Sequence, residues 1–129
     1  MDTKPIKRLT LLGSTGSIGR QSLEIADHLG YPVAALAAGS DVDTLEQQIR
    51  RYHPVAAALF DEKAAADLRV RVADTNTTVL SGMDGLCTLA AMELLPPVEG
   101  QTDMLLNAVV GMVGLQPTLA AIRAGHDVA

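Results

Sequence analysis

The segment GSTGSIG at positions 13–19 constrains the fold of this chain more than any other. A short apolar run, Ile6 to Leu12, precedes it and is typical of a buried parallel strand, which is covered on both faces. Apolar residues at helical spacing follow over Ser17 to Leu29, and Gly30 is placed to end that helix. The segment therefore joins a strand to a helix, where a turn aims unpaired N–H groups and the positive helix end at an anion.

Each glycine of this segment has a predicted role. We expect Gly13 to make the turn, Gly16 to let a pyrophosphate approach the backbone, and Gly19 to let helix and strand pack tightly. Thr15 and Ser17 add hydroxyl donors. The spacing is one residue longer than GxGxxG and lacks the Gly-Lys-Ser/Thr of a P-loop, which argues against ATP. The alternative is a Gly/Ser-rich turn that only shortens a loop.

Apolar runs and helical patterns alternate along the chain. Its 129 residues make about one ordinary domain. The first elements read strand, helix, strand, helix, strand, which is half of a doubly wound nucleotide-binding fold. We therefore predict an α/β domain over residues 1–129, a three-layer, Rossmann-like, doubly wound parallel sheet. The predicted strands are Ile6–Leu12, Pro32–Ala38, Val55–Phe60, Thr77–Leu80 at an edge, and Asp103–Val110, and the predicted helices are Ser17–Leu29, Val42–Tyr52, Asp61–Val72, Met83–Leu94 and Pro117–Ala124.

The end of the second predicted strand bears on the choice of cofactor. An acidic residue there would bind the ribose 2′-hydroxyl of NAD, but the strand runs into Gly39-Ser40-Asp41. This leaves room for the 2′-phosphate of NADP, with Ser40 and nearby amides as donors. Asp41 and Asp43 count against it, because two carboxylates repel a phosphate. The alternative is that Ser40 or Asp41 caps the helix that starts near Val42, and both roles can coincide.

A second glycine turn, GMVG at 111–114, follows the strand that we expect beside the first one. Dinucleotides bind across the switch point between two such strands. The apolar residues around the turn are Ala108, Val109, Val110 and Met112. They suit a nicotinamide ring or a ribose, and they suit an ordinary core equally well.

Charge is unevenly distributed. Through Arg20 the chain has four basic residues and the single acid Asp2, whereas the remainder has six basic and fourteen acidic residues. Only the first segment, with Lys4, Lys7, Arg8 and Arg20, is predicted to favour an anion. No basic stripe follows a later helix, and aromatic residues make up only 2%, so we expect no nucleic-acid partner.

The chain has one cysteine, Cys87, so an internal disulfide and a cysteine-based zinc site are excluded. We interpret Cys87 as a small apolar residue within a helix rather than a nucleophile. The charge-free stretch from Met104 to Ile122 is interrupted by Gly and Pro, which favours a strand, turn and helix over a membrane span. Leu9 to Leu12 is too short for a signal-peptide core, so we expect a cytoplasmic protein without a membrane partner. The histidines, predicted at the surface or at helix ends, are His28, His53 and His126.

Three segments together resemble the N-terminal, NADPH-binding domain of the 1-deoxy-D-xylulose 5-phosphate reductoisomerases. They are LTLLGSTGSIGRQSLEIA at 9–26, ALAAGSDV at 35–42 and LNAVVGMVGLQPTLAAIRAGHDVA at 106–129. The resemblance implies an oxidoreductase of non-mevalonate isoprenoid biosynthesis. Such an enzyme isomerises 1-deoxy-D-xylulose 5-phosphate and reduces it with NADPH to 2-C-methyl-D-erythritol 4-phosphate, using Mg²⁺ or Mn²⁺.

The resemblance also implies which residues bind the cofactor. Asp41 stands where the family commonly has Asn, which puts the mode of 2′-phosphate binding in question. The implied contacts are Thr15, Gly16, Ser17 and Ile18 for the pyrophosphate, Gly39, Ser40 and Asp41 for the adenosine phosphate, and Ala108 and Val109 beside the nicotinamide.

The sequence from His126 to Ala129 reads as the start of a further strand, so we expect a truncated chain. The family's Ala-Asn-Lys-Glu segment, metal-binding carboxylates and substrate-phosphate site would follow Ala129. We therefore expect cofactor binding without catalytic or metal-binding residues, and a homodimer for the whole enzyme.

Two alternatives belong to other classes of protein. A semialdehyde dehydrogenase has a similar GxTGxxG loop, but its catalytic cysteine would lie in a later segment than Cys87. A stand-alone nucleotide-binding module, or a folded chain that binds nothing, is the other alternative.

Overall fold

The computed structural model describes residues 6–91, 99, 101–109, 115–125 and 127–129. Strands and helices alternate along almost the whole of this part of the chain. In chain order they are β1 (Ile6–Leu12), α1 (Ser17–Leu29), β2 (Val33–Ala38), α2 (Val42–Tyr52), β3 (Ala56–Leu59), α3 (Glu62–Arg71), β4 (Thr78–Ser81), α4 (Gly82–Ala90), β5 (Gln101–Asn107), α5 (Leu115–Arg123) and β6 (Asp127–Val128).

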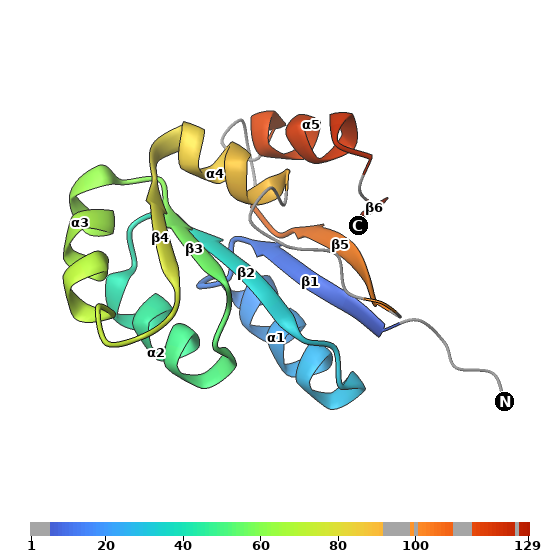
Figure 1. The fold of residues 1–129 in the computed structure, drawn as a ribbon, viewed down its shortest axis with the longest axis horizontal. Helices are drawn as coiled ribbons and strands as arrows, with labels where there is room; N and C mark the ends of the chain where they lie inside the picture. The colour runs from blue at the N-terminus through green and yellow to red at the C-terminus, as the bar shows by residue number, and fades with distance from the viewer. Residues whose placement is uncertain (1–5, 92–98, 100, 110–114, 126) are drawn as a thin grey trace, which may run out of the picture.

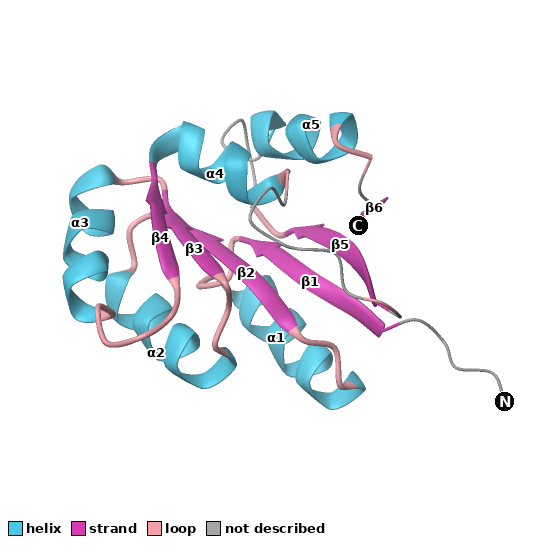
Figure 2. Cartoon of the chain, viewed as in Figure 1, coloured by secondary structure: helices cyan, strands magenta, loops and turns pink. Residues whose placement is uncertain are grey.

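The strands form one parallel sheet in the order β4-β3-β2-β1-β5-β6. Helices α1, α2 and α3 cover one face of this sheet, and α4 and α5 cover the other (Figures 1 and 2). The chain moves from β1 to β4 in one direction and then returns to β5 on the opposite side of β1. The prediction of an α/β, three-layer, doubly wound sheet is confirmed, and so is the position of β4 at an edge.

The central strands are built from small apolar residues that are buried on both faces. Every residue of β2 (VAALAA) and of β3 (AAAL) is buried, as expected for parallel strands between two helical layers. Leu23 of α1 and Ile49 of α2 pack on one face, and Leu86 and Leu89 of α4 pack on the other. Many small contacts, at about 25 cal/mol per Å² of apolar surface, thus stabilise the core.

Strand β5 differs from its predicted bounds. It begins at Gln101 rather than Asp103 and ends at Asn107, whereas Val110 lies outside the described residues. The side chain of Asn107 explains this end, because its Oδ1 accepts a hydrogen bond from the N–H of Val109 at 2.9 Å. Such a local bond to the backbone turns the chain out of the strand.

Three helices also differ from their predicted starts, and for α3 the difference is one residue, because Asp61 is its N-cap and Glu62 its first residue. Helix α4 begins at Gly82 instead of Met83, and it ends at Ala90, four residues short of the predicted end; residues 92–94 lie outside the described part. Helix α5 begins at Leu115, so Pro117 stands within its first turn. A proline is tolerated there because the first N–H groups of a helix have no intrahelical acceptor.

A partly buried ion pair joins β1 to β5. Arg8 and Asp103 lie directly opposite each other in the two strands. The Nε of Arg8 lies 2.6 Å from Oδ1 of Asp103, and its Nη2 lies 2.9 Å from Oδ2. Only 9% of the Arg8 side chain is exposed. Arg8 therefore holds two strands together, and the prediction that it favours an external anion was wrong.

Candidate functional site

The loop after β1 lies between the carboxyl ends of β2 and β5. The N–H groups of Gly13 and Ser14 donate to the carbonyl of Ala37 in β2, at 2.7 and 3.0 Å. On the other side, the N–H of Ala108 donates to the carbonyl of Leu12 at 2.8 Å. The structure therefore brings three of the predicted segments to one edge of the sheet, at the switch point where doubly wound folds bind dinucleotides.

Gly13 and Gly19 are glycines because the protein itself leaves no room for a side chain. Gly13 has φ +85°, and a Cβ there would lie 3.0 Å from the carbonyl carbon of Ala108. A Cβ on Gly19 would overlap the carbonyl oxygen of Gly13 and lie 2.8 Å from the Cα of Ser14. The turn at Gly13 is as predicted, whereas Gly19 packs against the loop itself rather than against the strand.

Gly16 has no such internal reason to be glycine. Its backbone, at φ −78° and ψ 173°, is one that any residue adopts. A Cβ at this position would meet only the carbonyl oxygen of Gly13, at the ordinary distance of 3.8 Å. The residue is exposed. The missing side chain thus leaves open space on the outside of the loop, where a ligand can approach the backbone.

The first turn of α1 is open to an anion. Gly16 is its N-cap, no side chain caps the helix, and no acidic residue stands in the first turn. Helices α2 and α3 differ, because the carboxylates of Asp41 and Asp61 cap them. The first N–H groups of a helix lack intrahelical acceptors and carry partial positive charge. Thr15 is half-buried beside this turn, whereas Ser17 and Ile18 are exposed on it.

The end of β2 carries Gly39 and Ser40 exposed to solvent, followed by Asp41. Oδ1 of Asp41 accepts a hydrogen bond from the N–H of Thr44 at 3.1 Å. This hydrogen bond, together with the nearby Arg20 guanidinium, holds the pKa of the Asp41 carboxyl below its usual value. The prediction that Ser40 or Asp41 caps this helix is confirmed for Asp41.

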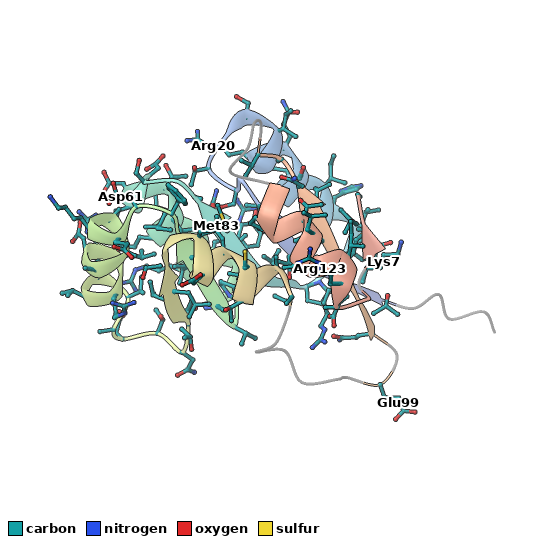
Figure 3. All side chains as sticks on the ribbon, turned by 90° about the horizontal axis from the view of Figure 1, so that it is seen from above. Lys7, Arg20, Asp61, Met83, Glu99 and Arg123 are labelled. Atoms are coloured by element: carbon teal, nitrogen blue, oxygen red, sulfur yellow. The ribbon has the colours of Figure 1, made fainter. Side chains whose placement is uncertain are left out.

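Arg20 lies at the same edge of the molecule. Its Nε donates to the carbonyl of Thr15 at 2.9 Å, and its Nη2 lies 3.4 Å from Oγ1 of Thr44. Figure 3 shows Arg20 and Asp61 on one side of the molecule and Glu99 on the opposite side. Lys7 stands at the amino end of β1, away from this edge. Of the basic residues predicted to favour an anion, Arg20 is thus the one that the described structure places here.

Gln48 of α2 supports the loop, a role that the sequence pattern did not predict. Its Nε2 donates to the carbonyl of Ser14 at 2.8 Å, and the residue is buried. Oε1 of Gln48 and Oγ of Ser14 are buried without a hydrogen-bond partner among the described residues. In the sequence, the one indication of this role is that Gln48 is a polar residue next to Ile49, on the face of the amphipathic helix that turns inward.

The third predicted segment is held at the end of β5. Ala108 and Val109 are half-buried, and Cγ2 of Val109 would lie 3.1 Å from a Cβ on Gly13. Nδ2 of Asn107 donates to Oγ1 of Thr118 at 2.9 Å, which ties this segment to α5. The predicted glycine turn at 111–114 lies outside the described residues.

The remaining candidate groups lie away from this edge or add no reactive group to it. Cys87 lies half-buried in α4, where burial and then the nearby Asp84 raise the pKa of its thiol. His28 and His53 are exposed at helix ends, as predicted. Among the described residues, no three His, Cys, Asp or Glu gather closely enough to hold a metal ion. No helix in the described part of the chain has the length and apolar character needed to cross a membrane.

Comparison with known proteins decides the family. A family model described as 1-deoxy-D-xylulose 5-phosphate reductoisomerase matches residues 9–129. The chain belongs to the 1-deoxy-D-xylulose 5-phosphate reductoisomerase family. This membership decides against the semialdehyde dehydrogenase alternative.

Named reductoisomerases are similar over nearly the whole of this chain. The reductoisomerase of Halothermothrix orenii is 41% identical over 122 residues, which make up 93% of this chain and 30% of that protein. The reductoisomerase of Desulfitobacterium hafniense strain DCB-2 is 44% identical over 126 residues, 96% of this chain and 31% of that protein. The chain thus spans less than a third of the length of these relatives.

Solved structures of reductoisomerases share the fold. The Zymomonas mobilis reductoisomerase in complex with NADPH matches 97% of this chain and 31% of that one, with a TM-score of 0.83 at 33% identity. A reductoisomerase in complex with NADPH, fosmidomycin and magnesium matches 95% of this chain and 29% of that one, with a TM-score of 0.84 at 35% identity.

Proposed function

We propose that this chain binds NADPH along the carboxyl ends of β2, β1 and β5, as the cofactor domain of a reductoisomerase. The observation that carries the proposal is the contrast among the three glycines of the loop. Gly13 and Gly19 are required by the packing of the protein, whereas Gly16 leaves empty space outside the loop. That space lies at the uncapped start of α1, which suits a pyrophosphate.

Different residues at this edge of the sheet would bind the pyrophosphate, the adenosine end and the nicotinamide end of the cofactor. The pyrophosphate would lie over Gly16, with the first N–H groups of α1 and the hydroxyls of Thr15 and Ser17 as donors. The adenosine end would lie at the exposed Gly39 and Ser40, and the nicotinamide end beside the half-buried, apolar Ala108 and Val109. When bound, NADPH supplies a hydride. The described residues supply its binding and orientation.

The whole enzyme would isomerise and reduce 1-deoxy-D-xylulose 5-phosphate to 2-C-methyl-D-erythritol 4-phosphate. Family membership over residues 9–129 supports this proposal. We assign no catalytic residue to the chain, and its described carboxylates do not form a site for Mg²⁺ or Mn²⁺. Because the chain spans less than a third of the length of its relatives, we expect no turnover from these 129 residues alone. A homodimer acting on a sugar phosphate remains the expectation from the sequence resemblance, and a cytoplasmic location remains the expectation from the short apolar run at Leu9 to Leu12.

Calorimetric titration of the chain with NADPH and NADH tests the proposal. We expect NADPH to bind more tightly than NADH, because no acidic residue follows β2 at the position that selects the ribose 2′-hydroxyl of NAD. Circular dichroism on the same sample checks that the chain is folded. A preference for NADH would contradict the proposed cofactor. A folded chain that binds neither nucleotide would contradict the binding site itself.

Replacement of Asp41 by asparagine should strengthen NADPH binding. The substitution removes a negative charge beside the proposed site of the 2′-phosphate, and at a partly exposed position this is worth on the order of 1 kcal/mol, or about fivefold in Kd. Asparagine is as good an N-cap as aspartate, so the melting temperature should change little. NADH is the control ligand, and its affinity should stay constant. An unchanged NADPH affinity would show that Asp41 lies too far from the phosphate to repel it.

A further inference from the structure

The groove between α1 and α2 is lined by three charged side chains, Arg20, Glu24 and Arg51. Two carboxylates, Asp41 and Asp43, stand at the start of α2, and Arg20 of α1 lies near Asp41. Asp43 forms an ion pair with Arg71 of α3, which takes its charge away from the loop after β1. Asp41 and Arg20 therefore remain as the charged pair near the end of β2, and Glu24 lies farther along the groove on α1.

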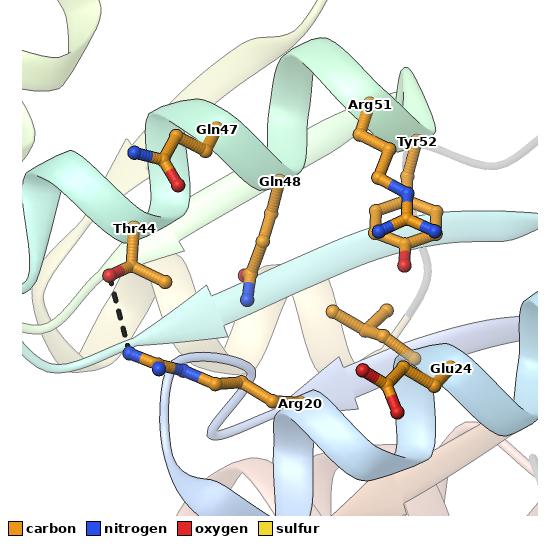
Figure 4. A pocket seen from close by; sticks show the side chains of 8 residues that line it. Arg20, Glu24, Thr44, Gln47, Gln48, Arg51 and Tyr52 are labelled. Atoms are coloured by element: carbon orange, nitrogen blue, oxygen red, sulfur yellow. Dashed lines mark hydrogen bonds between the residues drawn. The ribbon is translucent and has the colours of Figure 1, made fainter.

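The Arg20 guanidinium spans the gap between the two helices. Its Nε donates to the carbonyl of Thr15. Its Nη2 reaches Oγ1 of Thr44, as Figure 4 shows. Thr44 also donates its N–H to Asp41, so the guanidinium and the carboxylate share one neighbour. Nη1 of Arg20 donates to no described residue, and the side chain is exposed. These hydrogen bonds fix the orientation of the Arg20 guanidinium, and its Nη1 remains available to donate to a ligand.

Arg20 stands at one end of a groove between α1 and α2, and Arg51 stands at the other end (Figure 4). The two arginines differ in what already engages them. The Arg51 guanidinium lies 5.1 Å from the ring centre of Tyr52 and forms an ion pair with Asp27 at 3.3 Å. Arg20 has no ion pair shorter than 4 Å among the described residues. A bound anion would find its available partner at the Arg20 end, beside the loop after β1.

We propose that Arg20 binds the 2′-phosphate of NADPH and thereby determines the preference for NADPH over NADH. The inference rests on the proposed function, because it assigns a residue within the same site. The segment Gly39-Ser40-Asp41 supplies a hydroxyl and backbone amides but no cation, and its carboxylate repels a phosphate. The guanidinium from α1 supplies the missing charge, and its planar fork matches phosphate oxygens.

Titration of Arg20→Gln with NADPH and NADH tests this assignment. A hydrogen-bonded charge on phosphate predicts a loss of about tenfold to hundredfold in NADPH affinity, with NADH affinity within about twofold of the original chain. Arg20→Lys keeps the charge without the fork and should recover part of the loss. Arg51→Gln is the matched control, because it removes an arginine from the far end of the same groove, and it should leave both affinities unchanged.

The other outcomes overturn the assignment. An equal loss for NADPH and NADH in Arg20→Gln, together with a lower melting temperature, would mean that Arg20 only holds the loop through Thr15. Unchanged NADPH affinity would mean that the phosphate lies elsewhere. An equal loss in Arg51→Gln would mean that the effect comes from the charge of the whole groove. If the original chain binds neither nucleotide, the proposed function fails, and the role of Arg20 fails with it.

Discussion

Replacement of Gly19 by alanine is expected to destabilise the chain by about 3 kcal/mol, because the added methyl group has no space. It would overlap the carbonyl oxygen of Gly13 and press on the Cα of Ser14. Both neighbours are backbone, so α1 would have to move away from the loop. For a domain of this size the melting temperature should fall by roughly 10 °C. Thermal unfolding followed by circular dichroism measures the change.

Gly39→Ala is the matched control for this prediction. Gly39 is exposed, and a Cβ there would meet nothing within 4 Å. The same methyl group at position 39 should shift the melting temperature by only a degree or two. If Gly19→Ala unfolds at the same temperature as Gly39→Ala, the close packing of α1 on the loop is not as the structure has it.

Replacement of Gly16 by valine is expected to abolish dinucleotide binding while the fold survives. The backbone at Gly16 is extended, a conformation that valine adopts readily. The side chain would occupy the open space outside the loop and keep a pyrophosphate from the first N–H groups of α1. Lost hydrogen bonds to a charged group and steric exclusion together predict a loss of at least about hundredfold in NADPH affinity.

The control for Gly16→Val is Ala66→Val, which enlarges an exposed residue of α3. It should leave NADPH affinity unchanged. Because valine is a poor N-cap compared with glycine, Gly16→Val should cost about 1 kcal/mol of stability. NADPH binding by folded Gly16→Val with undiminished affinity would move the pyrophosphate away from this loop.

The local sequence was sufficient for much of the fold. The bounds of α1 and α2 are as predicted, because Gly30 ends the first helix in a left-handed conformation and Asp41 starts the second with a side-chain cap. The alternation of strands and helices predicted the switch point at β1, and the strand order confirms it. The loop at positions 13–19 was recognised because its glycines stand at a strand–helix junction.

Interactions between distant segments could not be predicted in this way. Arg8 read as part of a basic, anion-facing start, but its partner Asp103 stands far along the chain and became its neighbour only through sheet register. Gln48 supports the loop from another helix through a buried bond to Ser14. In the sequence, Arg20 is one of the four basic residues of the first segment. Its contact with Thr44 of α2, which distinguishes it from the others, is visible only in the structure. Each of these roles depends on tertiary contact, which residue patterns do not encode.

The position of β1 between β2 and β5 has a consequence for folding energetics. Strand β2 ends at Ala38 and β5 ends at Asn107, so a cofactor across these carboxyl ends would tie together segments far apart in the chain. Because an unfolded chain cannot offer such a composite surface, binding would raise stability by mass action. At a cofactor concentration one hundred times Kd the gain is about 2.7 kcal/mol. The cofactor would act as a reversible crosslink between the two halves of the sheet.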